Sequence, residues 1–320
     1  MTQARALWAV APGRCELRDE ALPALGADDV LVEATWSAVS KGTEGLVLAG
    51  RVPVSQHEAM RGPHMGGDFP FPVKYGYCVS GTVVDGALPA GTQVFCLHPH
   101  QDRFVVPASW AVPHRVAADR AVLAANVETA LNVVWDSGAG PGDRVVVVGA
   151  GVVGCLVAWL AGQLPGAEVT LVDVLPERAA MAEVLGVSFA TPDDVPDDAD
   201  VVVHASATEA GARTALAVAG HDAMVVEASW FGDRSISLPL GEAFHSRRLV
   251  LRSSQVGQIP PRRRPRWTHR RRLEKALELC ADPRLDALFT SACPFDELPL
   301  RLPEVVAGSG LCHRVDYRAR

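Results

Sequence analysis

The sequence predicts an α/β protein with two domains, a β-rich domain followed by a doubly wound parallel-sheet domain. The chain has 320 residues, which exceeds the usual size of one domain. Short strands punctuated by Gly and Pro fill its first third, whereas from about residue 120 apolar runs alternate with Ala- and Leu-rich helical segments. A glycine-rich turn joins one of these apolar runs to the helix that follows it. This order of elements favours two different sheet types in one chain.

The first third of the chain contains five predicted strands. Period-2 stretches and frequent turn residues are typical of a small, barrel-like β unit. The predicted strands are ALWAV, DVLVEATWSAV, GYCVSGTVVDG, GTQVFCL and RFVVPASW. Between the second and third strands lies the polar segment SKGTE, residues 40–44. As a sequence it reads either as a solvated turn or as the edge of an active site.

The middle of the chain predicts the parallel sheet. A helix is expected from near Asp119 to Gly138, where its apolar spacing ends at a glycine. Five strands then alternate with helices that begin at Val152, at Pro176 and near Glu209, which implies right-handed crossovers. These strands are RVVVVG, EVTLVD, DVVVHAS, AMVVEAS and LVLRSSQVG.

The C-terminal segment is too short to form a domain of its own. It contains the helix LEKALELCA, the strand-like LDALFTSACPF, one more helical stretch and the strand CHRVDY. We expect it to return to the first domain. The predicted β-rich domain therefore contains residues 1–122 and 258–320, and the predicted parallel-sheet domain contains residues 123–257.

Composition and charge exclude several classes of protein. The formal net charge is −7, whereas a general nucleic-acid binder would usually be basic. The N-terminus lacks a secretory signal, and four glycines interrupt the apolar run 145–162, so it reads as strand, turn and helix rather than as a membrane span. The seven cysteines are scattered without a C-x-x-C pair, which argues against a disulfide framework. We expect a cytoplasmic protein without nucleic-acid or membrane partners.

The segment VVVVGAGVVG predicts a dinucleotide site. Gly149, Gly151 and Gly154 form the pattern G-x-G-x-x-G between a buried strand and a helix. In this pattern the first glycine allows the tight turn, the second lets the backbone approach a pyrophosphate, and the third lets helix and strand pack closely. The first helical residues, Val152 and Val153, lie where unpaired N–H groups and the helix dipole favour phosphate.

The next strand supplies the acid that such sites use. Asp173 ends EVTLVD about twenty residues after the glycines, where a carboxylate can accept hydrogen bonds from the adenosine ribose hydroxyls. A carboxylate there repels a 2′-phosphate, so NAD is favoured over NADP. Arg178 lies close behind, and its positive charge leaves NADP open as the alternative.

The ordered set of motifs resembles the medium-chain dehydrogenase/reductase family of zinc-type alcohol dehydrogenase-like proteins. The segments that carry the resemblance are SKGTE, KYGYCVSGTVV, AGPGDRVVVVGAGVVG and LDALFTSACPFDEL. The resemblance implies a GroES-like catalytic domain, a Rossmann domain, a substrate cleft between them, and assembly into dimers or tetramers, of which we expect a homodimer. Within the family the chain is most similar to a short subgroup that includes bacteriochlorophyllide hydroxyethyl dehydrogenases.

At the positions where the family binds catalytic zinc, this sequence departs from the pattern. Alignment of SKGTE on the family's C-G-T-D loop places Lys41 at the first ligand. The family's Gly-His-Glu motif is replaced by residues 76–78, so Tyr77 stands at the second ligand, and the third falls near Ala124 or Ala125. An ammonium, a phenol and a methyl group cannot form a tetrahedral zinc site, so we expect no bound zinc.

Without zinc, another group must stabilise the negative charge that develops on a substrate oxygen. The resemblance places Lys41 and Tyr77 at the lost ligand positions, where an ammonium and an O–H group could act on that oxygen. If the two were adjacent, the lysine would lower the pKa of Tyr77 and make it an acid/base near neutral pH. The competing interpretation is that Lys41 faces solvent and Tyr77 packs in the core.

Further candidate residues lie in three segments. The resemblance implies that Thr43 passes the substrate proton towards solvent and that Glu44 braces the loop. In CLHPHQ, His100 can relay protons because histidine titrates near neutral pH. In NVETALN, Glu128 and Asn132 lie one helical turn apart, either contacting nicotinamide or substrate, or packing the helix.

A run of arginines near the C-terminal segment has more than one interpretation, and one of them concerns the charge of the substrate. Residues 262–272, RRRPRWTHRRR, contain seven arginines, which favour a solvated helix start or a subunit salt-bridge surface. Capture of an anionic small-molecule substrate is the minority interpretation.

The function that the sequence favours is a zinc-independent, NAD-preferring oxidoreductase that interconverts a secondary alcohol and a ketone. Two alternatives stay open. The first is an NADPH-dependent reductase of enones or quinones, and the second is a dinucleotide-binding protein without catalysis.

Overall fold

The computed structural model describes residues 3–319, which divide into two compact units. The first unit contains the chain up to Ala125 and again from Leu277, and the second runs from Asn126 to Ala276. Helices α3 (Ala124–Ser137) and α7 (His269–Leu279) carry the chain across the two boundaries. Residues 258–276, which the sequence prediction placed in the first domain, belong to the second unit, where Arg272 bonds to Glu128 of α3.

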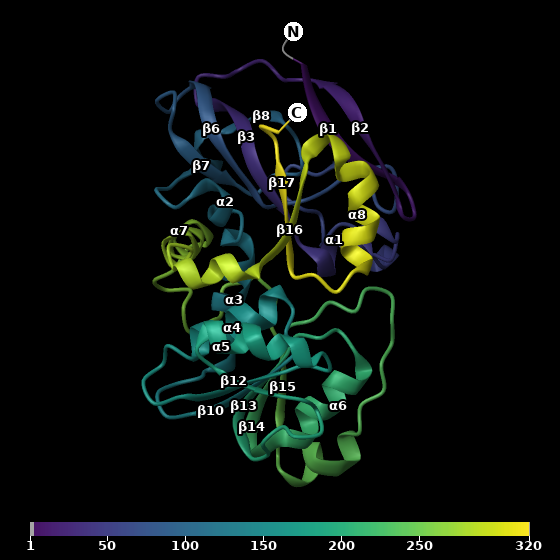
Figure 1. Cartoon of the computed structure of the whole chain (residues 1–320), viewed down its shortest axis with the longest axis vertical. Helices are drawn as coiled ribbons and strands as arrows, with labels where there is room; N and C mark the ends of the chain where they lie inside the picture. The colour runs from purple at the N-terminus through teal and green to yellow at the C-terminus, as the bar shows by residue number, and fades with distance from the viewer. Residues whose placement is uncertain (1–2, 320) are drawn as a thin grey trace. The chain divides into compact units, whose positions relative to one another are not determined.

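The first unit contains two β-sheets (Figure 1). The smaller has the strand order β2-β1-β5-β4. The larger has the order β16-β17-β3-β6-β7-β9, with β8 also paired to β3. Strands β16 and β17 run parallel, and the other pairs are antiparallel. The strands are β1 (Gln3–Ala11), β2 (Arg14–Ala21), β3 (Asp29–Val39), β4 (Gly66–Gly67), β5 (Val73–Lys74), β6 (Val79–Gly86), β7 (Gln93–Cys96), β8 (Arg103–Pro107), β9 (Val112–Pro113), β16 (Phe289–Pro294) and β17 (Cys312–Asp316).

Strand β3 has the bounds predicted for DVLVEATWSAV, because its alternation is strict at the start. Val30, Val32 and Ala34 are buried and pack in a cluster with Val79 and Phe104 of neighbouring strands. Side chains two residues apart on a strand share one face, so the period-2 pattern places this row in the core. The same sheet takes in the C-terminal strand β17, which pairs with β3.

The segment SKGTE forms a helix, not a loop. Helix α1 (Lys41–Leu48) begins directly after Ser40, and Glu44 accepts the backbone N–H of Ser40 at 2.7 Å through Oε1. A carboxylate in the first turn that accepts the N–H of the capping residue stabilises a helix start, here one residue later than in a capping box. Helix α1 packs against α8 (Leu298–Ala307), and α2 (Ala118–Ala121) packs against β3 and β6.

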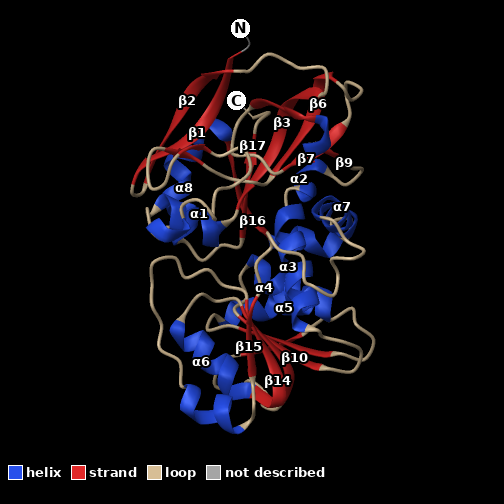
Figure 2. Ribbon diagram, turned by 180° about the vertical axis from the view of Figure 1, so that it is seen from behind, coloured by secondary structure: helices blue, strands red, loops and turns tan. Residues whose placement is uncertain are grey.

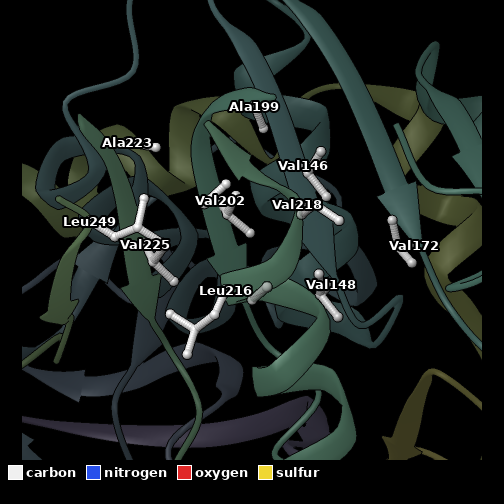
Figure 3. Packing of buried hydrophobic residues seen from close by; sticks show 12 residues of the cluster. Val146, Val148, Val172, Ala199, Val202, Leu216, Val218, Ala223, Val225 and Leu249 are labelled. Atoms are coloured by element: carbon white, nitrogen blue, oxygen red, sulfur yellow. The ribbon is translucent and has the colours of Figure 1, made fainter. Parts of the chain in front are cut away.

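The second unit contains a six-stranded parallel sheet of order β12-β11-β10-β13-β14-β15. Val146 and Val148 of one face pack with Leu216 and Val218 of α6 (Figure 3), while Val145 and Val147 point to the opposite face. Helix α4 packs against β10 and β11, and in Figure 2 α4 and α5 lie above the strands of this sheet and α6 to their left. The elements are β10 (Arg144–Val148), α4 (Val152–Ala161), β11 (Glu168–Val172), α5 (Ala179–Leu185), β12 (Ser188–Ala190), β13 (Ala199–His204), α6 (Glu209–Val218), β14 (Ala219–Glu227) and β15 (Val250–Ser253).

The single helix predicted from near Asp119 to Gly138 is two helices, α2 and α3. Val122 and Leu123 separate them, and both are fully buried. The apolar spacing continues across this break, which is why the sequence predicted one helix. No helix within residues 3–319 has the length and apolar character needed to cross a membrane.

Candidate functional site

Two of the three glycines in the glycine loop are required by packing within the chain. Gly149 has φ +110°, and a Cβ on it would lie 2.7 Å from the backbone nitrogen of Ser206. A Cβ on Gly154 would lie 1.8 Å from the carbonyl oxygen of Gly149. The tight turn and the close approach of α4 to the turn therefore explain these two residues.

Gly151 has no such explanation inside the chain. Its backbone is extended, with φ −75° and ψ 179°, a conformation open to any residue. A Cβ on Gly151 would meet no atom within 4 Å. Gly151 is also the N-cap of α4, so no side chain caps the first N–H groups of this helix, where Val152 and Val153 lie. The open space and the uncapped N–H groups fit a phosphate group that approaches the backbone closely.

Asp173 is held against the glycine loop. Its Oδ2 accepts the N–H of Ala150 at 2.7 Å, and its Oδ1 accepts the N–H of Leu175 at 3.0 Å. Each carboxylate oxygen keeps a second lone pair that a ribose hydroxyl can use. The pKa of the Cys155 thiol in α4 is raised to about 12, mainly by burial. The charges of Arg178, which lowers this pKa, and of Asp173, which raises it, also act on the thiol, so both side chains lie near the start of α4. The predicted cofactor residues therefore gather at one end of the sheet.

In the first unit, three hydroxyl groups lie together at the start of α1. The Tyr77 hydroxyl donates to Ser40 Oγ at 2.6 Å, and it also hydrogen-bonds the side chain of Thr43. Burial raises the pKa of Tyr77 well above its usual value, against smaller lowering effects of Ser40 and Thr43. Tyr77 is therefore a protonated hydrogen-bond donor at neutral pH. Sequence reasoning missed Ser40, although its place before a helix start was a signal.

The Lys41 side chain binds backbone oxygens near the C-terminal end of the chain. Its ammonium donates to the carbonyl oxygens of Gly308 and Gly310, the latter at 2.8 Å, in the loop between α8 and β17. Burial raises the pKa of Tyr77, so the structure does not show the lowered pKa that an adjacent Lys41 would give. Lys41 also lines a cavity of about 310 Å³ in the first unit, together with Arg301 and His313.

His100 belongs to a buried polar network. Its Nε2 bonds Glu44 Oε2 at 2.9 Å, and its Nδ1 bonds Ser37 Oγ at 2.7 Å. Ser37 in turn bonds the hydroxyl of Tyr317 at 3.0 Å. His100 and Glu44 are only 1% and 4% exposed, so the network fixes the carboxylate that holds Ser40. His100 thus positions the start of α1.

Glu128 and Asn132 both bind Arg272. The guanidinium donates to Glu128 Oε1 at 2.9 Å, to the side-chain oxygen of Asn132, and to the carbonyl of Val256. Burial raises the pKa of Glu128, although the neighbouring Arg272 opposes this effect. Arg272 is 2% exposed, so the interpretation of the arginine run as solvated is wrong for this member. It is confirmed for five others that are exposed, namely Arg262, Arg263, Arg264, Arg266 and Arg271.

The residues at the zinc-ligand positions of the resembling family do not fit a zinc ion. Tyr77 is occupied by two hydroxyl partners, Lys41 binds carbonyl oxygens, and Ala125 offers no side-chain donor. Within residues 3–319, no group of three or more His, Cys, Asp or Glu side chains is arranged to hold a metal ion.

Comparison with known proteins places this geometry in a known fold. No family profile and no curated protein matches the sequence. A Sinorhizobium meliloti protein described as a zinc-binding dehydrogenase, solved with NADP, matches 99% of the chain over 100% of its own length, with TM-score 0.80 and 18% identity. A thermostable alcohol dehydrogenase of Pyrobaculum aerophilum matches 98% over 100%, with TM-score 0.77 and 19% identity. The chain has the alcohol dehydrogenase fold.

A third structure of this fold was solved with its cofactor. A short chain alcohol dehydrogenase of Escherichia coli CFT073, complexed with NADH, matches 99% of the chain over 100% of its own length, with TM-score 0.77 and 15% identity. The predicted combination of a β-rich domain with a Rossmann-type parallel sheet is confirmed by the alcohol dehydrogenase fold.

Proposed function

We propose that the chain is an NAD(P)-dependent oxidoreductase of the medium-chain dehydrogenase/reductase family. The observation that carries this proposal is Gly151, because neither its backbone conformation nor the packing around it requires a residue without a side chain. Backbone N–H groups at Gly151, Val152 and Val153 would hold the pyrophosphate of a dinucleotide. Asp173 would hold the adenosine ribose, which favours NAD over NADP. The solved NADP and NADH complexes of the same fold support a nicotinamide dinucleotide as the cofactor.

The reaction that we propose interconverts a secondary alcohol and a ketone. A bound nicotinamide cofactor supplies or accepts the hydride. Tyr77 is the donor that best replaces a metal, because its hydroxyl is kept protonated and held by Ser40 and Thr43. When a ketone is reduced, Tyr77 donates its proton to the carbonyl oxygen, since an alkoxide is a stronger base than a phenolate. A proton from solvent then reaches the Tyr77 phenolate through the hydroxyls of Thr43 and Ser40, each of which gives up one proton and takes up another.

The cofactor assignment is tested by a pair of glycine variants. Gly151→Ala should weaken NADH binding about tenfold or more, because the methyl group occupies space that the pyrophosphate needs. Its urea unfolding midpoint should not change, since the methyl group meets no atom. Gly140→Ala is the matched control, because a Cβ there meets only Asp143 at 3.9 Å, away from the loop. Equal NADH affinity in both variants and the wild type would overturn the proposal.

The reaction is tested by Tyr77→Phe in a panel of secondary alcohols, ketones and enones. We expect kcat to fall about 10²-fold or more, because the proton donor proposed for the reacting oxygen is lost. NADH affinity should not change, since the hydroxyl binds Ser40 and Thr43 and none of the groups proposed to hold the cofactor. Lys41→Met should change kcat little, since its ammonium holds two carbonyls. The opposite pattern would restore the lysine hypothesis. Faster reduction of enones with NADPH than of any ketone would support the alternative reductase.

We also propose a homodimer formed through β15. This strand is at the edge of the parallel sheet, and its Val250 and Leu251 are 45% and 41% exposed. An exposed apolar edge strand can pair with the same strand of a second copy, which removes both edges. Leu251→Lys should convert the dimer to a monomer in light scattering. A wild-type monomer at micromolar concentration would contradict this proposal.

A further inference from the structure

A buried histidine that no proposed function uses lies beside the glycine loop. His204 ends β13, and Glu227 ends the neighbouring strand β14, directly opposite in register. His204 Nδ1 bonds Glu227 Oε2 at 2.7 Å, and His204 Nε2 bonds Ser206 Oγ at 2.7 Å. The second oxygen of Glu227 accepts the N–H of Ser229 at 2.8 Å, which fixes the carboxylate. His204 is only 1% exposed, so its two ring nitrogens meet this carboxylate and this hydroxyl instead of solvent.

From Ser206 the hydrogen bonds continue to the surface. Ser206 Oγ bonds Thr208 Oγ1 at 2.9 Å, and Thr208, which is exposed, caps α6 by accepting the N–H of Gly211 at 3.0 Å. Ser206 lies against the glycine loop, because its backbone is what a side chain on Gly149 would collide with. The path from the buried carboxylate therefore emerges at the carboxyl ends of the parallel strands, next to the glycine loop, where open α/β sheets bind their ligands.

The direction of this hydrogen-bond chain depends on one proton. A carboxylate only accepts, so Nδ1 of His204 carries a hydrogen. When Nε2 is bare, it accepts from Ser206, and Ser206 accepts from Thr208, so every hydroxyl points inward. When Nε2 carries a proton, it donates to Ser206, and the hydroxyls turn to point outward. A proton added at the exposed Thr208 end can thus reach the His204–Glu227 couple by hydroxyl rotation and transfer.

We propose that His204 is the proton-exchanging group of the dinucleotide site, binding a proton with the reduced cofactor and releasing it with the oxidised one. This inference rests on the proposed function. The oxidised nicotinamide ring carries a positive charge that the reduced ring lacks, and like charges in one site disfavour each other. Glu227 supplies the negative charge that makes an imidazolium tolerable in a buried position.

Other charged groups around His204 are already engaged. Arg234 donates to the carbonyl of Ala207 at 2.7 Å and lies over the ring of Phe231, whose centroid is 6.1 Å from that of His204. From α6, Glu209 accepts from Arg213 and from the N–H of Ser237. On the side of the glycine loop, Asp173 accepts the N–H of Ala150. Glu227 is the charged group in direct contact with the imidazole.

The experiment is calorimetric titration of the full chain with NADH and with NAD⁺ at pH 7, in phosphate and in Tris. The two buffers differ in ionisation enthalpy, so the difference in heat gives the number of protons taken up. NADH binding should take up about half a proton or more beyond NAD⁺ binding, by linkage. His204→Gln should remove this difference while both cofactors still bind. His221→Gln, which changes an exposed histidine of β14, should leave the difference intact.

The outcomes separate the two proposals. Absence of binding by the wild type would refute the dinucleotide site itself. Binding without a proton difference, or a difference that persists in His204→Gln, would overturn the role of His204 alone. If His204→Gln fails to fold, NMR of the wild-type imidazole decides: the His204 titration midpoint should lie at higher pH with NADH than with NAD⁺. Equal midpoints would refute the inference.

Discussion

Removal of Glu128 should be among the most destabilising single changes in the second unit. Glu128→Leu would leave the Arg272 guanidinium, 2% exposed, without its carboxylate partner at 2.9 Å. Breaking a buried ion pair from one side typically costs about 3–5 kcal/mol, because a buried charge is left uncompensated. With an m-value of about 3 kcal/mol per molar urea, the unfolding midpoint should fall by about 1–1.7 M. Tryptophan fluorescence can follow the transition, since Trp135 and Trp267 pack together nearby at 4.7 Å.

Two further variants give this prediction its control. Arg270 and Glu274 form an exposed pair on the same helix, so Glu274→Ala should cost only about 0.5 kcal/mol or less. The double variant Glu128→Leu with Arg272→Met removes both charges and should lose less stability than Glu128→Leu alone. The reasoning fails if Glu128→Leu costs under about 1 kcal/mol, or if the double variant loses the sum of the two single changes.

Three other predictions follow from single side chains. Burial lowers the pKa of His313 to about 4, so the unfolded chain binds the proton more tightly, and stability should fall by about 2 kcal/mol as pH drops from 6.5 towards 4. Urea midpoints across this range should show a smaller fall in His313→Gln; identical slopes would contradict the assignment. Ala207 has φ +52°, so Ala207→Gly should stabilise the chain by about 0.5–1 kcal/mol in thermal unfolding, and destabilisation would argue against strain there. Gly154→Ala should unfold at clearly lower urea than the wild type, because its methyl group would meet a carbonyl oxygen, and an unchanged midpoint would disprove that contact.

The parts of the fold that depend on residues close in sequence could be predicted from the sequence. Strand β3 was predicted with its observed bounds because the alternation of buried and exposed residues is encoded residue by residue. The glycine loop was readable because turn, close packing and ligand approach each need a residue without a side chain. Strand β2 was missed, since RCELRDEA has charged residues on both faces and none of its residues is buried.

Contacts between distant residues could not be predicted in the same way. His100 meets Glu44 over a separation of 56 residues, and Arg272 meets Glu128 over 144. No local pattern indicates such pairs, because each residue alone resembles an ordinary polar surface residue. The helical start at SKGTE is a local contact, because the bond from Ser40 to Glu44 spans only four residues, but the spacing is one residue longer than in the capping box that marks such starts.

The buried pair of Glu128 and Arg272 bears on how the chain could have been assembled. The second unit is one continuous stretch, Asn126 to Ala276, set within a first unit that resumes at Leu277. A module inserted into a host chain must bring its first and last residues together, since the host's own chain is interrupted at a single point. Glu128 lies near the start of this stretch and Arg272 near its end, and their bond fastens the two ends to each other from within the module. The bond therefore closes the second unit within itself, between the two helices through which the chain enters and leaves it.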